Sequence, residues 1–404
     1  MKLNIAIIGT GSAGASSALY FTKNGHAVTV FEREEEPKPV GAGIMLQPTG
    51  LQCLREFGLD EKAISLGSKI IGMEGTCDDK KIIDLSFKNK DHLFGLGIHR
   101  GALFFLLFDK LIEEGIDVRL GAEIIEISGD KKKTLTDTKG NKFKDFDLVV
   151  VANGARSSLR KGLPIIKIER VQKYGALWSK IPFENKRFDD KIIQFYKGTH
   201  KMAGFMPIGK PTKESPEFVN FFWSIKFDEI ENWKNNTSLD EWKSQILELA
   251  PDYADVIANL KSKDDVMIAP YMDVELKPSY HNNIVFIGDA AHPMSPQLSQ
   301  GAGFAMLDSK LLSESIEKNR GNIQLALKKY HLKRSKQVYF YQKVSRIVTP
   351  MFQSDSNNTW IRNNLFNLFS KINPTKKIIN NTLLGYRESV FGDLEKKYYK
   401  GNSY

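Results

Sequence analysis

The segment LNIAIIGTGSAGASSALYFTKNGHAVTVFE, residues 3–32, decides the fold of the N-terminal part of the chain. It reads as an apolar strand (3–8), a G-x-G-x-x-G turn (Gly9–Gly14), a helix, a second strand (27–31) and an acid, Glu32. The glycines allow a tight turn and let backbone approach a pyrophosphate, which the free amides of the helix N-terminus attract. Glu32 stands where a carboxylate can bind ribose hydroxyls. The segment therefore predicts a dinucleotide site, without separating NAD from FAD.

The bulk composition is that of a globular enzyme. The chain has 404 residues, of which 41% are hydrophobic and 26% charged, enough for about two domains. No apolar run approaches the ~20 residues of a membrane span, and no secretory leader is expected. Cys53 and Cys77 are the only cysteines, so we expect no disulfide framework, no metal site and a cytoplasmic location.

The positive charge is concentrated near the C-terminus. The net charge is +10, and residues 328–377 hold eleven Lys or Arg against one acid, Asp355. Nucleic acid or an anionic membrane could use such a face. Aromatic residues recur through the same segment, which favours a helical lobe that packs over the active site and exposes its lysines. We therefore expect no nucleic-acid partner and give peripheral membrane contact little weight.

Three distant segments bear on the choice between NAD and FAD. The first, GAGIMLQP at residues 41–48, is a glycine-rich loop on which a flat ring could lie, and residues 51–75 after it are expected to be helical. The second, DLVVVANGARSSLR at 147–160, is a buried strand followed by a polar turn. The third, IGDAAHPMSPQLSQGAGFAMLD at 287–308, places an Asp at a strand end, then prolines and glycines before a helix. That helix N-terminus could face a negatively charged group.

Together these motifs resemble the class A, para-hydroxybenzoate hydroxylase-like, FAD-dependent aromatic monooxygenases, over about residues 1–330. The resemblance implies an α/β fold: a Rossmann-like FAD domain (1–75, 96–173 and 275–330), an inserted antiparallel-sheet substrate domain (76–95 and 174–274) and a C-terminal helical region (331–404). Asn153-Gly154 departs from the family's usual Asp-Gly, and Ser299 and Gly303 replace its usual Gly and Asn.

The resemblance also implies the site residues. Asp289 is expected to bond the ribityl chain of FAD, and the helix after Gln300-Gly301 to point at the flavin. The candidate catalytic residues are Pro296, whose carbonyl is expected near the flavin C4a, and Gln47. The residues expected to contact FAD are Gly9, Gly11, Ser12, Ala13, Gly14, Glu32, Arg33, Gly43, Ile44, Arg100, Gly288, Asp289, Pro296, Gly301, Ala302 and Gly303. Aromatic residues of the sheet are candidates for the substrate pocket: Trp178, Phe195, Phe205 and Phe222.

The implied chemistry is hydroxylation of an electron-rich small molecule. Non-covalent FAD would be reduced by NADH or NADPH and would react with O2 to a C4a-hydroperoxide, whose distal oxygen the substrate attacks. Some pyridine hydroxylases place a His where this chain has Met45, and we find no catalytic base. A flavin halogenase is disfavoured because the segment at Trp178 lacks a second Trp.

Two further functions are compatible with the motifs. One is an antibiotic-modifying, tetracycline-inactivating enzyme, with which Asn153-Gly154 agrees. The second is a flavin-binding partner protein without turnover. A monomer or a homodimer is expected.

Overall fold

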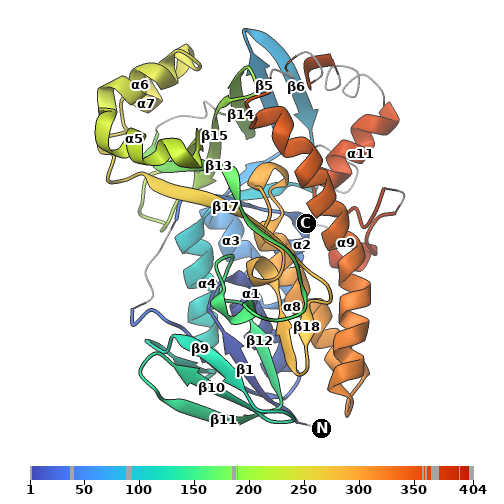
Figure 1. The fold of residues 1–404 in the computed structure, drawn as a ribbon. Helices are drawn as coiled ribbons and strands as arrows, with labels where there is room; N and C mark the ends of the chain where they lie inside the picture. Colours follow the sequence, from blue (N-terminus) through green and yellow to red (C-terminus); the bar gives the residue numbers. More distant parts are fainter. Residues whose placement is uncertain are drawn as a thin grey trace.

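A computed structural model describes residues 2–36, 41–87, 93–183, 188, 190–356, 359, 362–364, 373–390 and 392–399 (Figure 1). The N-terminal half of the sequence contributes most of a six-stranded sheet with the order β18-β19-β12-β1-β2-β8. Its strands are β1 (Asn4–Ile8), β2 (Ala27–Phe31), β8 (Asp117–Arg119), β12 (Leu148–Val151), β18 (Tyr280–His281) and β19 (Ile284–Phe286). All neighbours are parallel except β18 and β19.

Both faces of this sheet are covered, which explains why β12 is an uninterrupted apolar run. Ile5, Ile7 and Val150 pack against the helices of one face, whereas Ile8 and Val151 pack against a small sheet on the other. The helices are α1 (Ser12–Lys23), α4 (Arg100–Glu113) and α8 (Gly301–Lys318). The small sheet is formed by β9 (Ile124–Ser128), β10 (Lys133–Asp137) and β11 (Lys142–Phe146).

A second sheet of seven strands lies at the other end of the molecule, with the order β17-β13-β16-β15-β14-β5-β6. Its neighbours are antiparallel except β14 and β5. The strands are β5 (Gly72–Cys77), β6 (Lys80–Ser86), β13 (Ile166–Pro182), β14 (Lys191–Lys197), β15 (Lys201–Gly209), β16 (Phe218–Lys226) and β17 (Met267–Leu276).

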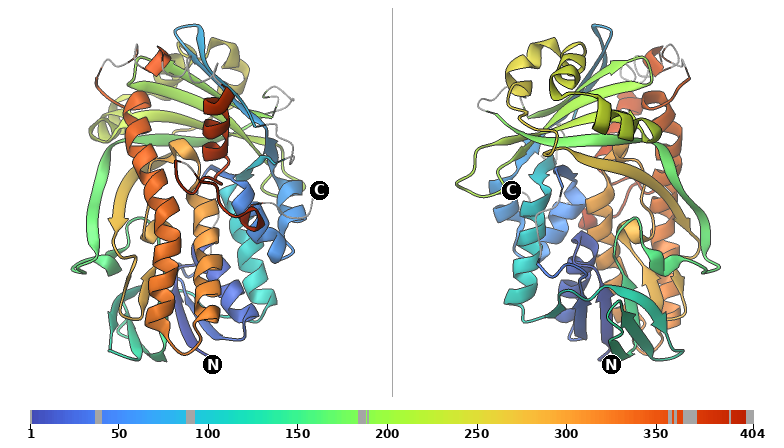
Figure 2. Two further views of the ribbon diagram at one scale, coloured as in Figure 1. Left: turned by 90° about the vertical axis from the view of Figure 1, so that its right-hand side faces the viewer. Right: turned by 60° about the vertical axis from the view of Figure 1, so that its left-hand side comes forward.

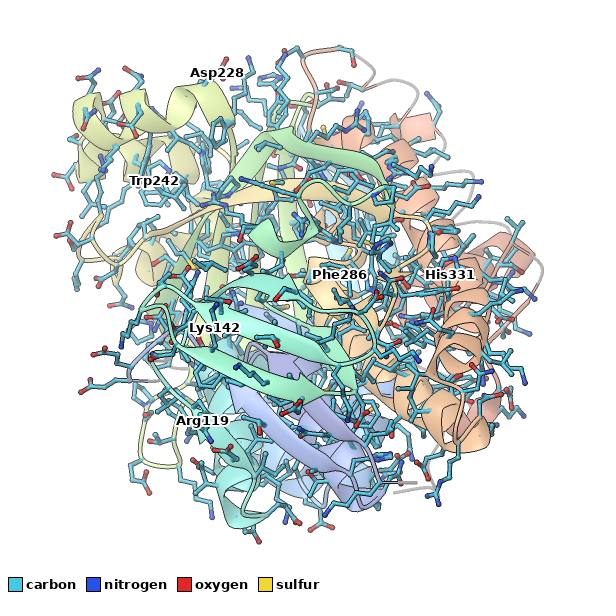
Figure 3. All side chains as sticks on the ribbon, turned by 60° about the horizontal axis from the view of Figure 1, so that its bottom comes forward. Arg119, Lys142, Asp228, Trp242, Phe286 and His331 are labelled. Carbon is cyan, nitrogen blue, oxygen red and sulfur yellow. The ribbon has the colours of Figure 1, made fainter. Side chains whose placement is uncertain are left out.

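Three short helices cover the outer face of the second sheet (Figure 2). They are α5 (Ile230–Asn236), α6 (Leu239–Leu247) and α7 (Ala254–Ile257). Trp242 of α6 is fully buried in a second hydrophobic core between these helices and the sheet, and Figure 3 shows it within this helical group. The mixed α/β class with an inserted, mainly antiparallel sheet is confirmed. The domain limits stay a prediction, and the second sheet already begins at Gly72 and Ile166.

A fourth sheet, of three strands, lies beside the two larger ones, with the order β3-β7-β4. It is formed by β3 (Gly43–Leu46), β4 (Ser68–Ile70) and β7 (Gly95–His99) and is accompanied by α2 (Pro48–Glu56) and α3 (Asp60–Leu66). The expectation of helix over residues 51–75 is wrong beyond Leu66. Gly67 ends α3 in an extended conformation, and the following β-branched residues Ile70 and Ile71 suit strands.

The long helix α9 (Ile323–Phe352) runs beside α8 and reaches the second sheet (Figure 2). In its first half Arg334 bonds the fully buried Asp308 of α8, and near its end Arg346 bonds Asp273 of β17 (Nη2–Oδ1 2.9 Å). His331, labelled in Figure 3, lies on the side of this helix that faces β18, where its Nδ1 accepts the Ser279 amide (3.3 Å). The helix therefore fastens the first sheet's layer to the second sheet by charged contacts. Helix α11 (Asn373–Leu383) follows it.

Short 3₁₀ turns complete the described structure: η1 (Ser158–Arg160), η2 (Phe227–Glu229), η3 (Pro251–Tyr253), η4 (Gly288–Ala290), η5 (Pro296–Leu298) and η6 (Lys396–Tyr398). Within the described ranges, no helix has the length and apolarity needed to cross a membrane.

We predict that Asp273→Ala lowers the free energy of unfolding by about 1.5–3 kcal/mol, because it removes a buried carboxylate and leaves the partly buried Arg346 with Glu275 (2.7 Å) as its carboxylate partner. Asp273 accepts bonds from both Arg170 and Arg346. Urea denaturation measures the loss. Asp117→Ala removes an exposed pair with Arg119 and serves as the control, with an expected loss below about 1 kcal/mol. Equal losses for the two variants would contradict the fastening role.

Candidate functional site

The turn between β1 and α1 is built for close approach of backbone. Gly9 has φ +102°, a conformation that favours glycine, and a Cβ on Gly14 would lie 1.8 Å from the Gly9 carbonyl oxygen. A Cβ on Gly11, the N-cap of α1, would meet nothing within 4 Å. No side chain caps this helix and no acid lies in its first turn. The amides at Ser12 and Ala13 thus begin a helix that suits a pyrophosphate.

Glu32 follows β2 and is tied to the same turn. Its Oε2 accepts hydrogen bonds from the Thr10 amide (2.9 Å) and the Thr10 hydroxyl, and its Oε1 accepts from the Glu34 amide (3.2 Å). These contacts fix the carboxylate beside the glycine turn. Arg33 instead points to solvent, where it pairs with Glu34 (3.0 Å).

The loop after β19 brings the other end of the sequence to this edge of the sheet. Gly288 has φ +55° and donates its amide hydrogen to Asp308 (2.8 Å). Asp289 is exposed between the buried residues Gly288 and Ala290. A Cβ on Gly301 would lie 3.9 Å from Asp289 Oδ1, so the Asp289 carboxylate faces the start of α8.

The N-terminus of α8 is also free of a side-chain cap and of acids in its first turn. Gly301 is exposed and Ala302 half-buried, and Ser299 just before them has φ +51°. A Cβ on Gly303 would lie 3.0 Å from Thr49 Oγ1, which makes this a close contact between α8 and α2. The Pro296 carbonyl accepts the Ser299 amide (2.9 Å) and so closes the η5 turn.

The loop around β3 completes the site from a third direction. The Gly43 amide donates to Asn220 Oδ1 of β16 (2.9 Å), which joins the residue before Ile44 to the second sheet. Arg100 begins α4, donates its amide to Ala42 (3.0 Å) and lays its side chain against Gly41. These contacts place the glycine loop between the two sheets.

Two histidines of the motifs have structural partners. His99 Nδ1 accepts the Gly101 amide and caps α4 (3.2 Å), and burial followed by the charge of Lys180 lowers its pKa to about 4. His292 Nε2 lies 2.6 Å from Asp308 Oδ2. Burial raises the pKa of Asp308, but His292 and Arg334 outweigh burial and hold that pKa at about 2.

The structure divides the four aromatic pocket candidates between two faces of the second sheet. Trp178 and Phe222 face the first sheet, with their rings 5.7 Å apart. Phe195 and Phe205 lie on the opposite face, in the core with Trp242 and the short helices. The reason is the period of two along a strand, by which Phe221 and Phe222 also point to opposite sides. The four residues therefore do not line one pocket.

The site also contains buried polar atoms that fit a bound polar cofactor. Among the described residues, Gln47 Oε1, Thr49 Oγ1, Asn153 Oδ1 and Ser295 Oγ are buried without a hydrogen-bond partner. Such atoms are costly unless satisfied. Together with the two uncapped helix N-termini, the open space at Gly11 and the exposed Asp289, they fit a dinucleotide with a polar ring system.

Sequence reasoning missed two residues of the site. Asp308 ends the stretch 287–308 and lies on the helix that follows the glycines. An acid among the apolar residues of that helix was the available signal of a buried, paired carboxylate. Asn220 is an isolated polar residue in an aromatic strand, FVNFFWSIK, which could have marked it as a contact with another element.

Comparisons with known proteins agree with this geometry. Residues 2–338 match the family described as FAD binding domain. The kynurenine 3-monooxygenase of Christiangramia forsetii is 25% identical over 338 residues, which cover 78% of this chain and 72% of that protein. The 2-heptyl-3-hydroxy-4(1H)-quinolone synthase of Pseudomonas aeruginosa is 27% identical over 378 residues, 91% of this chain and 94% of that protein.

A solved structure has the same fold. The tetrameric form of 2-methyl-3-hydroxypyridine-5-carboxylic acid oxygenase superposes with a TM-score of 0.76 at 20% identity, over 94% of this chain and 96% of that chain. The resemblance inferred from the motifs is confirmed by these matches, and they do not favour the antibiotic-modifying or non-catalytic functions.

We predict that Asp289→Ala raises the Kd for FAD by about 10- to 100-fold, because a charge-assisted hydrogen bond contributes ~1.5–3 kcal/mol. Glu32→Ala is expected to raise it less, because its carboxylate is partly occupied by Thr10. Titration of the apoprotein with FAD, followed by flavin fluorescence, measures both. A larger effect of Glu32→Ala than of Asp289→Ala would reverse the assignment.

Proposed function

We propose a reaction for this chain, which belongs to the FAD binding domain family. In this proposal the protein hydroxylates a small aromatic molecule that already carries an electron-donating hydroxyl or amino group. The chain is a FAD-dependent monooxygenase, and NAD(P)H and O2 are the co-substrates of that class. The observation that carries the substrate proposal is the pair Trp178 and Phe222, two aromatic rings on the face of the second sheet that is turned toward the cofactor motifs.

The residues that would hold FAD come from both ends of the sequence. The uncapped start of α1 would bind the pyrophosphate, Glu32 the ribose, and Asp289 a hydroxyl of the ribityl chain. The start of α8, at Gly301 to Gly303, would carry its partial positive charge toward the flavin ring. When bound, FAD supplies hydride acceptance and the activation of oxygen, and the protein supplies orientation and electrostatics.

The protein's further task is to keep water from the reacting atoms. The face of the second sheet that carries Trp178 and Phe222 is turned into the main hydrophobic core, away from the short helices. The β3 loop is joined to that sheet by the bond from Gly43 to Asn220. A site closed in this way protects a reactive oxygen species from loss to solvent. Gln47, buried with an unpaired carbonyl oxygen, could orient the substrate.

The surroundings of the two motif histidines support a substrate that needs little base catalysis. His99 caps a helix and has a lowered pKa, and His292 is held by Asp308. Both side chains are therefore engaged in structural contacts. A ring that is already electron-rich at neutral pH can react without a catalytic base, and the names of the relatives refer to a kynurenine, a quinolone and a hydroxypyridine.

We predict product formation with nitrogen-containing aromatic substrates. FAD-loaded protein, supplied with NADH or NADPH and air, is incubated with kynurenine, a 4-quinolone, a hydroxypyridine and a tetracycline. Hydroxylated product is quantified by mass spectrometry against peroxide formed. Product from one of the first three with the tetracycline unchanged is expected. Peroxide without product from any of them would reject the proposal.

We predict that Phe222→Leu raises the KM for the best substrate of that set by about 3- to 10-fold, because the ring contributes ~1 kcal/mol of stacking and contact. Phe221→Leu is the matched control: it is the next residue, is also buried, and faces the outer core. It should lower thermal stability and leave KM unchanged. A raised KM in the Phe221 variant alone would place the pocket on the other face.

A further inference from the structure

We propose that Gln300 and Gln337 are positioning residues that hold the C-terminal turn, residues 382–387, as a wall of the active site. The proposal rests on the proposed function, since it assigns this turn to the same site. The turn follows α11 and lies far in the sequence from every cofactor motif. Its described contacts nevertheless lead back to α8, at its N-cap Gln300 and at Asp308 in its interior.

The first contact is made by Gln300, the N-cap of α8. Its side chain is buried, and its Nε2 donates to the carbonyls of Leu298 (2.6 Å) and Leu383 (2.9 Å), with Thr382 at 3.4 Å. The amide thus joins the start of α8, which is proposed to face the flavin, to the end of α11. Tyr341 adds a bond from its hydroxyl to the Thr382 carbonyl (2.8 Å).

The second contact is made by Gln337 of α9, which is fully buried. Its Nε2 donates to the carbonyls of Gly385 (3.0 Å) and Arg387 (2.9 Å). Its Oε1 accepts from Arg334, which also bonds Asp308. Because Asp308 accepts the Gly288 amide, an unbroken series of bonds runs from the turn to the loop that carries Asp289.

Gly385 shows how tightly the turn is seated. It has φ +83°, and a Cβ there would lie 2.3 Å from Gln300 Oε1 and 3.5 Å from Gln47 Cβ. Gln47 Cβ is in turn 3.6 Å from the position of a Cβ on Gly303. The turn therefore touches the side chains that flank the first turn of α8, so that its displacement would move them.

The experiment compares Gly385→Ala with Gly321→Ala in the FAD-loaded full chain. Gly321 also has positive φ (+94°), but a Cβ there meets nothing within 4 Å, so both variants place an alanine at a positive φ and only one collides with Gln300. Three quantities are measured: the Kd for FAD, the quenching of flavin fluorescence by iodide, and hydroxylated product formed per NADH oxidised.

We expect Gly385→Ala to lower product per NADH by about fivefold and to raise iodide quenching, with the Kd for FAD changed by less than about twofold. Gly321→Ala should match the wild type in all three. In the Gln300→Ala background the collision is absent. Adding Gly385→Ala to that background should therefore lower product per NADH no more than adding Gly321→Ala does. Gln337→Met, which removes the two donors to the turn, should reproduce the loss of coupling without a steric conflict.

The proposal is overturned if Gly385→Ala and Gln337→Met both equal the Gly321 variant in quenching and coupling. It is also overturned if the Gln300 background does not reduce the effect of Gly385→Ala. If the wild type forms no product with any substrate, the proposed function fails, while the iodide comparison still decides whether the turn shields the flavin.

Discussion

The buried carboxylate of Asp308 is the interaction on which the arrangement of the molecule depends. A buried charge is tolerated only when it is paired and hydrogen-bonded. The Asp308 carboxylate is bonded by the Gly288 amide, His292 and Arg334. These three partners belong to the cofactor loop and to α9, so one carboxylate fixes the loop that carries Asp289 and the helix that carries the C-terminal part of the chain. Protonation below its pKa of about 2 would remove this link, which makes it secure at physiological pH.

Helix α9 and the β3 loop connect the two large sheets. Arg346 secures α9 to the second sheet at Asp273, and Asn220 secures the glycine loop to the same sheet. The aromatic face is therefore held at a fixed relation to the cofactor motifs by polar contacts that are largely removed from water. Burial in this zone strengthens each bond and raises the cost of breaking it.

Sequence alone predicted the parts of the site that depend on local chemistry. The glycine turn, Glu32 and the Gly288-Asp289 loop follow from steric and hydrogen-bonding demands of a few adjacent residues. Which aromatic residues face the cofactor depends on strand register, and that is why Trp178 and Phe222 could not be separated from Phe195 and Phe205. The pairing of Asp308 with Arg334, and of Gln337 with the turn, joins residues distant along the chain and leaves no periodic signal. The helix expected over residues 51–75 failed for a local reason, the glycine and β-branched residues after Leu66.

The strand order of the first sheet has a consequence for biosynthesis. Strand β12 lies between β1 and β19, and β19 is encoded after the whole of the second sheet. During translation the strands β1, β2 and β12 leave the ribosome with the short edge of β12 unpaired until residues 284–286 follow. The inserted sheet, whose strands β13 to β17 and covering helices are contiguous in the chain, can assemble in that interval. All strands of the second sheet therefore leave the ribosome before the first sheet can gain β19.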